Sequence, residues 1–198
     1  MRVKICGITN YDDAMIAVEA GADALGFVFY EASPRYIAPE KALEICRQIP
    51  PFVDRVGLFV HSDSQTINTV CTESLMSLAQ IHWDAPQRLF DNLRVKSLKV
   101  VRAQSRRDVV LHTGEVCLVD AFVKEFGGAG EQLPREWFEN VDCSKMILAG
   151  GLTPDNVEAA TRLGVYGVDV SSGVERSRGI KDREKIVQFI KNAKRRRK

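Results

Sequence analysis

Two ionisable residues end apolar segments at points where a strand would give way to a loop. Cys6 ends Val3–Cys6, and Asp120 ends Val116–Asp120. Ligands of parallel α/β proteins bind at the carboxyl edge of the strands, so both residues are candidates for a functional site. A lone cysteine is also commonly a small buried apolar residue. A carboxylate buried at such a position is costly unless it is partnered or functional.

Two loops near the C-terminus have the composition of a phosphate site. Leu148–Pro154 places Gly150 and Gly151 after an apolar segment, and Val168–Val174 places Ser171, Ser172 and Gly173 after the next one. Small residues leave backbone N–H groups accessible to an anion, and the last two loops of a βα barrel frequently hold a phosphate. Simple turn formation is the alternative, but two such loops in consecutive units favour phosphate binding. Thr153 and Pro154 are expected as the N-cap and first residue of the following helix.

Four further features could contribute to a site. Arg35 follows the second apolar segment, and its planar guanidinium suits a carboxylate, although a surface arginine is usually only solvated. Asp169 occupies the position of Asp120 in the last unit, with loop capping or pairing with a lysine as the alternative. His82 follows the fourth segment and is interpreted as a hydrogen-bonded rim residue. The glycines around Gly128 could form a loop that closes over a substrate, or simply a flexible turn.

The elements that must position these residues alternate along the chain. The expected strands are rich in Val, Ile, Leu and Phe without clean alternation, as in parallel sheets buried on both faces; they are Val3–Cys6, Ala24–Phe29, Arg55–Val60, Leu78–His82, Leu98–Arg102, Val116–Asp120, Met146–Ala149 and Gly167–Ser171. Helices are expected at 11–22, 39–49, 63–73, 86–92, 105–112, 134–140, 154–163 and 182–194.

Eight such βα units predict an α/β fold, a (βα)8 TIM barrel of parallel strands that forms a single domain over residues 1–198. The fourth and fifth strands carry the weakest patterns. A doubly wound open sheet with fewer strands is the alternative there.

Composition excludes several classes of protein. Of the 198 residues 45% are hydrophobic and the formal net charge is +2, which argues against a surface built for nucleic acid or membrane. No apolar run approaches the roughly 20 residues of a membrane span, and no apolar signal segment begins the chain, so a cytoplasmic protein is expected. The five cysteines are scattered, which predicts reduced thiols and no metal site. The basic residues 194–198 are interpreted as a solvated end of the last helix.

Seven stretches, in order and spread over nearly the whole chain, resemble the phosphoribosylanthranilate isomerase family: Lys4–Thr9, Gly26–Phe29, Ser33–Tyr36, Val56–Val60, Phe126–Gly130, Leu148–Pro154 and Asp169–Glu175. The resemblance implies a cofactor-free (βα)8 barrel of tryptophan biosynthesis. Its reaction is the Amadori rearrangement of N-(5-phosphoribosyl)anthranilate to 1-(2-carboxyphenylamino)-1-deoxyribulose 5-phosphate. The only partner implied is this phosphorylated small molecule, with no nucleic acid or membrane, and a monomer or homodimer is expected.

The resemblance also implies roles for individual residues. Cys6 is expected to be the general base and Asp120 the general acid, while Arg35 holds the anthranilate carboxylate. Asp169 and Gly128 are expected to contact the substrate, and the phosphate is expected at Gly150, Gly151, Ser171, Ser172 and Gly173. Because a free thiol is mostly protonated at neutral pH, we hypothesise that Lys4, on the same strand face, assists Cys6.

Three alternatives remain open at this point. The related aldose–ketose isomerase of the histidine pathway uses two aspartates, and Cys6 stands where an Asp would be expected. A barrel that binds a phosphorylated ligand without catalysis is the second alternative. Nucleic-acid binding through the basic tail is the third and predicts strongly salt-dependent association.

Overall fold

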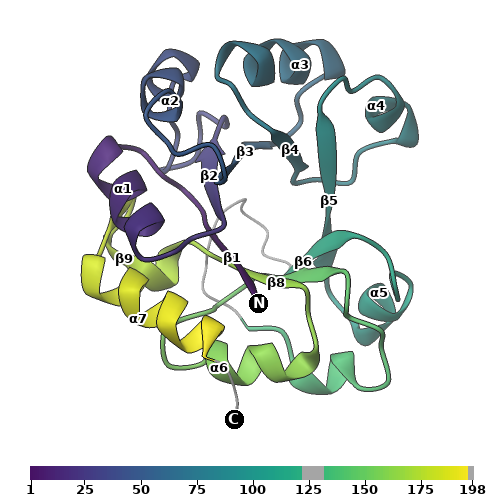
Figure 1. Ribbon diagram of the computed structural model, residues 1–198. Helices are drawn as coiled ribbons and strands as arrows, with labels where there is room; N and C mark the ends of the chain where they lie inside the picture. The colour runs from purple at the N-terminus through teal and green to yellow at the C-terminus, as the bar shows by residue number, and fades with distance from the viewer. Residues whose placement is uncertain (122–131, 196–198) are drawn as a thin grey trace.

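A closed ring of parallel strands forms the centre of the molecule, with the helices around its outside (Figure 1). The computed structural model describes residues 1–121 and 132–195. The strands follow one another around the ring in sequence order; they are β1 (Arg2–Ile5), β2 (Ala24–Val28), β3 (Asp54–Phe59), β4 (Leu78–Ile81), β5 (Lys96–Ala103), β6 (Cys117–Ala121), β7 (Met146–Leu148) and β8 (Gly167–Val170). The prediction of a (βα)8 barrel is confirmed, and the open-sheet alternative is wrong.

Pairing of the first strand with the last closes the ring. Lys4 of β1 stands opposite Asp169 of β8, and Ile5 stands opposite Val170, both in parallel register. The weakly patterned β4 and β5 pair along their length, from Leu78 with Lys96 to Ile81 with Lys99. Each predicted strand lies within two residues of the observed one at either end.

Three of the helices begin at a side chain that caps a free N–H group. Asn10 accepts a hydrogen bond from the backbone of Asp13, Asp63 accepts one from Thr66, and Asp182 starts the last helix in the same way. The α-helices are α1 (Tyr11–Glu19), α2 (Pro39–Cys46), α3 (Ser64–Glu73), α4 (Gln87–Asp91), α5 (Arg106–Val110), α6 (Val157–Ala160) and α7 (Arg183–Lys194), and the 3₁₀ turns are η1 (Arg135–Phe138), η2 (Thr161–Leu163) and η3 (Ser172–Val174).

Two segments differ from the sequence-based expectation. The helix expected from 154 begins only at Val157, because the Asn156 side chain accepts from the N–H of Thr153 and caps the turn instead. The segment expected to be helical at 134–140 is the 3₁₀ turn η1. A short antiparallel hairpin of β9 (Glu175–Ser177) and β10 (Ile180–Lys181), which was not predicted, follows β8.

Alternation along each strand separates the core from the barrel interior. Outward residues such as Val3, Ile5, Val168 and Val170 pack against the helices in the main core. Inward residues at the lower levels form a second, smaller cluster, composed of Leu98, Val100, Leu118 and Ala149. Above that cluster, towards the carboxyl edge of the strands, Asp120 and Asp169 occupy inward positions. The apolar residues of the barrel interior thus lie beneath a layer that contains polar side chains.

Candidate active site

Ionisable residues from four strands, β1, β4, β6 and β8, lie at the carboxyl edge of the barrel. Lys4 and Cys6 share the inward face of β1, because they are two residues apart. Asp120 lies one inward step beyond Leu118 of β6, and Asp169 lies inward on β8. His82, directly after β4, completes the group through its contact with Asp120.

Cys6 is buried against a glycine that leaves room for its sulfur. A methyl group added to Gly26 would lie 2.8 Å from Sγ of Cys6 and 3.0 Å from Cε of Lys4. The backbone N–H of Cys6 donates to the carbonyl oxygen of Val170 across the β1–β8 seam, at 2.8 Å. Burial raises the pKa of the Cys6 thiol, while the charge of Lys4 opposes this rise and Asp169 adds to it. The Cys6 thiol is therefore closely packed, and the positive charge of Lys4 favours its ionisation.

Lys4 forms a buried ion pair with Asp169. Its Nζ donates to both carboxylate oxygens, at 3.0 and 2.9 Å, and neither side chain is more than 8% exposed. Burial acts to lower the pKa of Lys4, but the charge of Asp169 and that of a Cys6 thiolate keep it above its ordinary value. Lys4 therefore remains a cation beside the thiol, and the pairing of Asp169 with a lysine, considered from the sequence, is what the structure contains.

The opposing effects of this pair on Cys6 give a testable prediction. Replacing Lys4 by Met is expected to slow alkylation of Cys6 by iodoacetamide about tenfold near pH 8, and replacing Asp169 by Asn is expected to accelerate it, because nearby opposite and like charges move a pKa in opposite directions. Peptide mass spectrometry after timed labelling separates Cys6 from the other thiols. Acceleration in both variants would point to loosened packing and contradict an electrostatic role for Lys4.

Asp120 has the properties of a general acid. Its side chain is 24% exposed, and burial together with the charge of Asp169 raises its pKa to about 6. Nε2 of His82 lies 3.6 Å from Oδ2 of Asp120. Burial, Arg102 and Lys4 lower the pKa of His82 to about 4, so this imidazole is neutral at neutral pH. The carboxyl group can carry a proton close to physiological pH, and its histidine neighbour does not.

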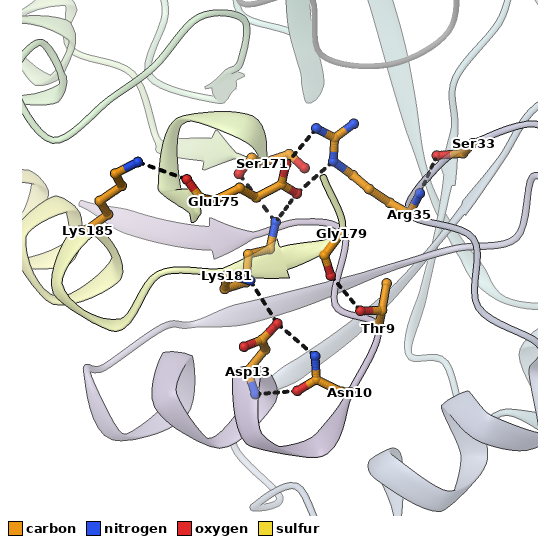
Figure 2. Close-up of polar contacts among 10 residues, drawn as sticks. All are labelled: Thr9, Asn10, Asp13, Ser33, Arg35, Ser171, Glu175, Gly179, Lys181 and Lys185. Carbon is orange, nitrogen blue, oxygen red and sulfur yellow. Dashed lines mark hydrogen bonds and ion pairs between the residues drawn. The ribbon is translucent and has the colours of Figure 1, made fainter. Parts of the chain in front are cut away.

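Arg35 is held by a carboxylate rather than by solvent. Its Nε and Nη2 donate to the two oxygens of Glu175, each at 2.8 Å (Figure 2). Its stem packs directly against Gly7. Lys181 donates to the same carboxylate at 2.9 Å. Sequence analysis did not predict Glu175 or Lys181 as site residues. The available signal was a run of charged residues immediately after the second predicted phosphate loop.

The two predicted phosphate loops pack directly on each other. A methyl group added to Gly173 would collide with the carbonyl oxygen of Leu152 and lie 3.0 Å from its carbon. Gly150 and Gly151 both have positive φ, at 85° and 58°, a conformation that glycine adopts without strain. Oγ of Ser171 is buried and has no hydrogen-bond partner among the described residues. The arrangement offers a compact anion cradle with one unused hydroxyl donor.

A methyl group at Gly173 should therefore separate the two loops. Gly173→Ala is expected to reduce the free energy of unfolding by about 1–3 kcal/mol, as for other overpacked sites, and to weaken binding of inorganic phosphate about tenfold or more. Urea denaturation and calorimetric titration measure the two effects. Gly164→Ala is the control for a loss of stability alone, since Gly164 has a φ of 74°, which strains an alanine, but no atom within 4 Å of an added methyl group. It should lose stability while retaining phosphate affinity.

Some predicted features lie outside the described residues. Gly128 falls within 122–131, and the last residues of the basic tail fall within 196–198. In the part of the chain that the structure describes, no group of three or more His, Cys, Asp or Glu residues is arranged to hold a metal ion. No helix in that same part is both long and apolar enough to cross a membrane.

The closed barrel, with a buried thiol and an acid of raised pKa at its carboxyl edge, defines a TIM-barrel enzyme of the acid–base type. A family model described as N-(5′-phosphoribosyl)anthranilate (PRA) isomerase matches residues 3–192. The chain therefore belongs to the PRA isomerase family.

Individual relatives agree with this assignment over the full length of the chain. The N-(5′-phosphoribosyl)anthranilate isomerase of a Nitratiruptor species is 58% identical over 194 residues, which are 98% of this chain and 99% of the relative. The crystal structure of phosphoribosyl anthranilate isomerase from Thermotoga maritima is 40% identical, with a TM-score of 0.90 and 98% of each chain covered. A crystal structure of a phosphoribosyl anthranilate isomerase in complex with reduced 1-(o-carboxyphenylamino)-1-deoxyribulose 5-phosphate is also 40% identical, with a TM-score of 0.82 and 98% of each chain covered.

Proposed function

We propose that this chain catalyses the Amadori rearrangement of N-(5′-phosphoribosyl)anthranilate, a step of tryptophan biosynthesis. Membership of the PRA isomerase family supports the reaction, and the complex of a relative with a reduced product supports a phosphorylated small molecule as the ligand. The observation that carries the proposal is the placement of Cys6, directly after β1, and of Asp120, in β6, at the carboxyl edge of the same closed barrel. Both lie within electrostatic reach of the same Lys4–Asp169 pair in the barrel interior.

In the proposed first step, Asp120 acts on the ribose ring. Its carboxyl group gives a proton to the ring oxygen as the bond between that oxygen and C1′ breaks, and the anthranilate nitrogen supplies the electron pair of the resulting iminium. A pKa of about 6 suits this task, because a fully solvated aspartate would be almost entirely ionised at neutral pH. The iminium then acidifies the hydrogen on the adjacent C2′.

In the second step, the Cys6 thiolate removes the C2′ hydrogen to give an enolamine, which ketonises to the product. Lys4 supports the thiolate through its charge, since the pKa of the buried thiol would otherwise be higher still. Arg35 is proposed to bind the anthranilate carboxylate, and Asp169 to line the sugar pocket beside Lys4. The cradle of Gly150, Gly151, Ser171, Ser172 and Gly173 is proposed to hold the phosphate.

A fluorescence assay tests the proposal. Freshly formed phosphoribosylanthranilate is fluorescent, so addition of the wild-type protein is expected to abolish the signal at a rate proportional to enzyme concentration. A folded protein that binds the reduced product but leaves the fluorescence unchanged would favour the non-catalytic barrel. Turnover of the histidine-pathway aminoaldose in place of phosphoribosylanthranilate would favour the related isomerase.

Cytoplasmic location, a single domain, a monomeric or homodimeric state and the lack of a cofactor remain predictions.

A further inference from the structure

Arg35 forms a buried cluster with two charged side chains to which the proposed chemistry gives no role, Glu175 and Lys181. Arg35, Glu175 and Lys181 are only 6%, 7% and 3% exposed. The Glu175 carboxylate accepts two hydrogen bonds from Arg35 and one from Lys181 (Figure 2). Burial acts to raise the pKa of Glu175, but Arg35 and Lys181 hold it below its usual range, so the carboxylate stays ionised. Burying ions is costly, and such a cluster needs a reason beyond stability.

The cluster is tied to the proposed phosphate cradle and, through the hairpin, to the loop and helix after β1. Lys181 Nζ donates to the carbonyl oxygen of Ser171, in the proposed phosphate cradle, at 3.3 Å. Its backbone N–H donates to Asp13 at 2.9 Å, and Thr9 Oγ1 donates to the carbonyl oxygen of Gly179 at 2.6 Å. Figure 2 shows these contacts anchoring the β9–β10 hairpin to the loop and helix after β1. Glu175 therefore links Arg35 to the framework that carries the phosphate loop.

The geometry of the arginine leaves one edge of its guanidinium for another ligand. Glu175 engages Nε and Nη2, and Nη1 has no hydrogen-bond partner among the described residues; Figure 2 shows it directed away from Glu175. Because the guanidinium is planar and rigid, fixing the Nε edge also fixes the direction of the remaining donors. The stem of Arg35 passes over Gly7, which directly follows the proposed general base Cys6 in the chain.

We propose that Glu175 is a positioning residue that holds the guanidinium of Arg35 ready for the aromatic carboxylate of the substrate. The inference rests on the proposed function, because it takes the anthranilate carboxylate as the ligand of Arg35. An arginine without this clamp would have to lose rotamer freedom on binding, and part of the binding energy would be consumed by that ordering. Glu175 thus sets carboxylate recognition without touching the substrate.

The test compares two probes that differ only in the carboxylate. One is reduced 1-(o-carboxyphenylamino)-1-deoxyribulose 5-phosphate, and the other is its phenyl counterpart without the carboxyl group. The wild type is expected to bind the carboxylated probe about 10- to 100-fold more tightly, the range for a hydrogen bond to a charged group. Glu175→Gln should reduce this preference about tenfold while changing the affinity for the phenyl probe by less than about threefold. In turnover, KM should rise more than kcat falls.

A second variant separates positioning from charge. Glu175→Gln leaves two buried cations without their anion, whereas Glu175→Gln combined with Lys181→Met restores the net charge of the cluster without restoring the clamp. The preference should stay reduced in the double variant. Lys185→Met is the matched control, since Lys185 donates to the backbone oxygen of Glu175 and not to its carboxylate. It should retain the full preference.

The outcomes are distinct from a failure of the isomerase assignment. An undiminished preference in both Glu175 variants would overturn the positioning role while leaving turnover by the wild type untouched. Recovery of the preference in the double variant would show that charge and not geometry had been lost, and would also overturn it. A wild type that turns over substrate yet shows no preference would overturn the inference together with the role of Arg35. A wild type without turnover would refute the proposed function itself.

Discussion

Cys6→Ala is expected to lower kcat about a thousandfold, within the range that positioned proton transfer contributes. The alanine leaves no group on the inward face of β1 beyond Lys4 that could remove the C2′ hydrogen. Affinity for the reduced product should change by less than about threefold, because the side chain is small and its removal leaves the proposed contacts of Arg35 and the phosphate cradle in place. The fluorescence assay gives kcat, and calorimetry gives the affinity.

Cys46→Ala is the matched control for the loss of a buried thiol. Cys46 lies at the end of α2 in the main core, where burial raises the pKa of its thiol to about 12. This variant should lose some stability and keep its kcat. A Cys6→Ala protein that retains more than about a tenth of the wild-type kcat would remove the thiol from the proposed chemistry.

Asp120→Asn is expected to reduce kcat about 10²- to 10⁴-fold, because the amide has the size of the carboxyl group but gives no proton to the ring oxygen. The pH dependence identifies the group further. In the free wild-type enzyme, Asp120 loses its proton as pH rises through about 6, while the thiol of Cys6 ionises only above its raised pKa.

Between these two pKa values one of the two groups has lost its proton, and in most molecules it is Asp120. The productive form, with Asp120 protonated and Cys6 ionised, is therefore a small fraction of the enzyme. Consequently kcat/KM should rise as pH increases through about 6 and fall above the pKa of the thiol. The rise of kcat/KM near pH 6 reflects the coupled titration of Asp120 and Cys6, and it should disappear in Asp120→Asn. Persistence of that limb in the variant would show that another group titrates there.

The same substitution should stabilise the fold at neutral pH. The folded pKa of Asp120, about 6, lies above the ordinary value of 3.8, so the folded chain binds this proton more tightly than the unfolded chain. The wild type thus loses stability as pH rises from about 4 to 6, and Asn removes that loss. Asp120→Asn should gain up to about 3 kcal/mol above pH 6 and nothing below pH 4. Urea denaturation at both pH values tests this, with Asp12→Asn, at an exposed position, as control.

The positions of the strands could be predicted closely because buried parallel strands have a strong local signature. Even the charged β5 was recognised, although its true extent, Lys96–Ala103, exceeds the predicted Leu98–Arg102 at both ends. Hydrogen bonds to neighbouring strands extend β5 into polar residues that hydrophobicity alone does not mark. The start of α6 was misplaced because Thr153 donates its N–H to the side chain of Asn156 and forms a turn before the helix, which the Thr-Pro pair does not indicate.

Partners that are distant in sequence could not be predicted in the same way. Arg35 and Glu175 are 140 positions apart, and Lys4 and Asp169 are 165 positions apart, so no local pattern indicates that they meet. The sequence predicts that Arg35 binds a substrate carboxylate, but it does not indicate that the Glu175 carboxylate already occupies one edge of the guanidinium. Lys4 was expected to act on Cys6, whereas the opposing charge of Asp169 becomes evident only once β1 and β8 pair.

The seam between β1 and β8 has a consequence for how the protein is made. The ribosome releases β1 before the other seven strands and β8 after them, so β1 remains without this neighbour while the strands between them are synthesised. Until then, β1 and the most recently released strand present unpaired edges, which invite association with other nascent chains. The ion pair between Lys4 and Asp169 can form only when the ring closes. The candidate active site is therefore completed only after all eight strands have been synthesised.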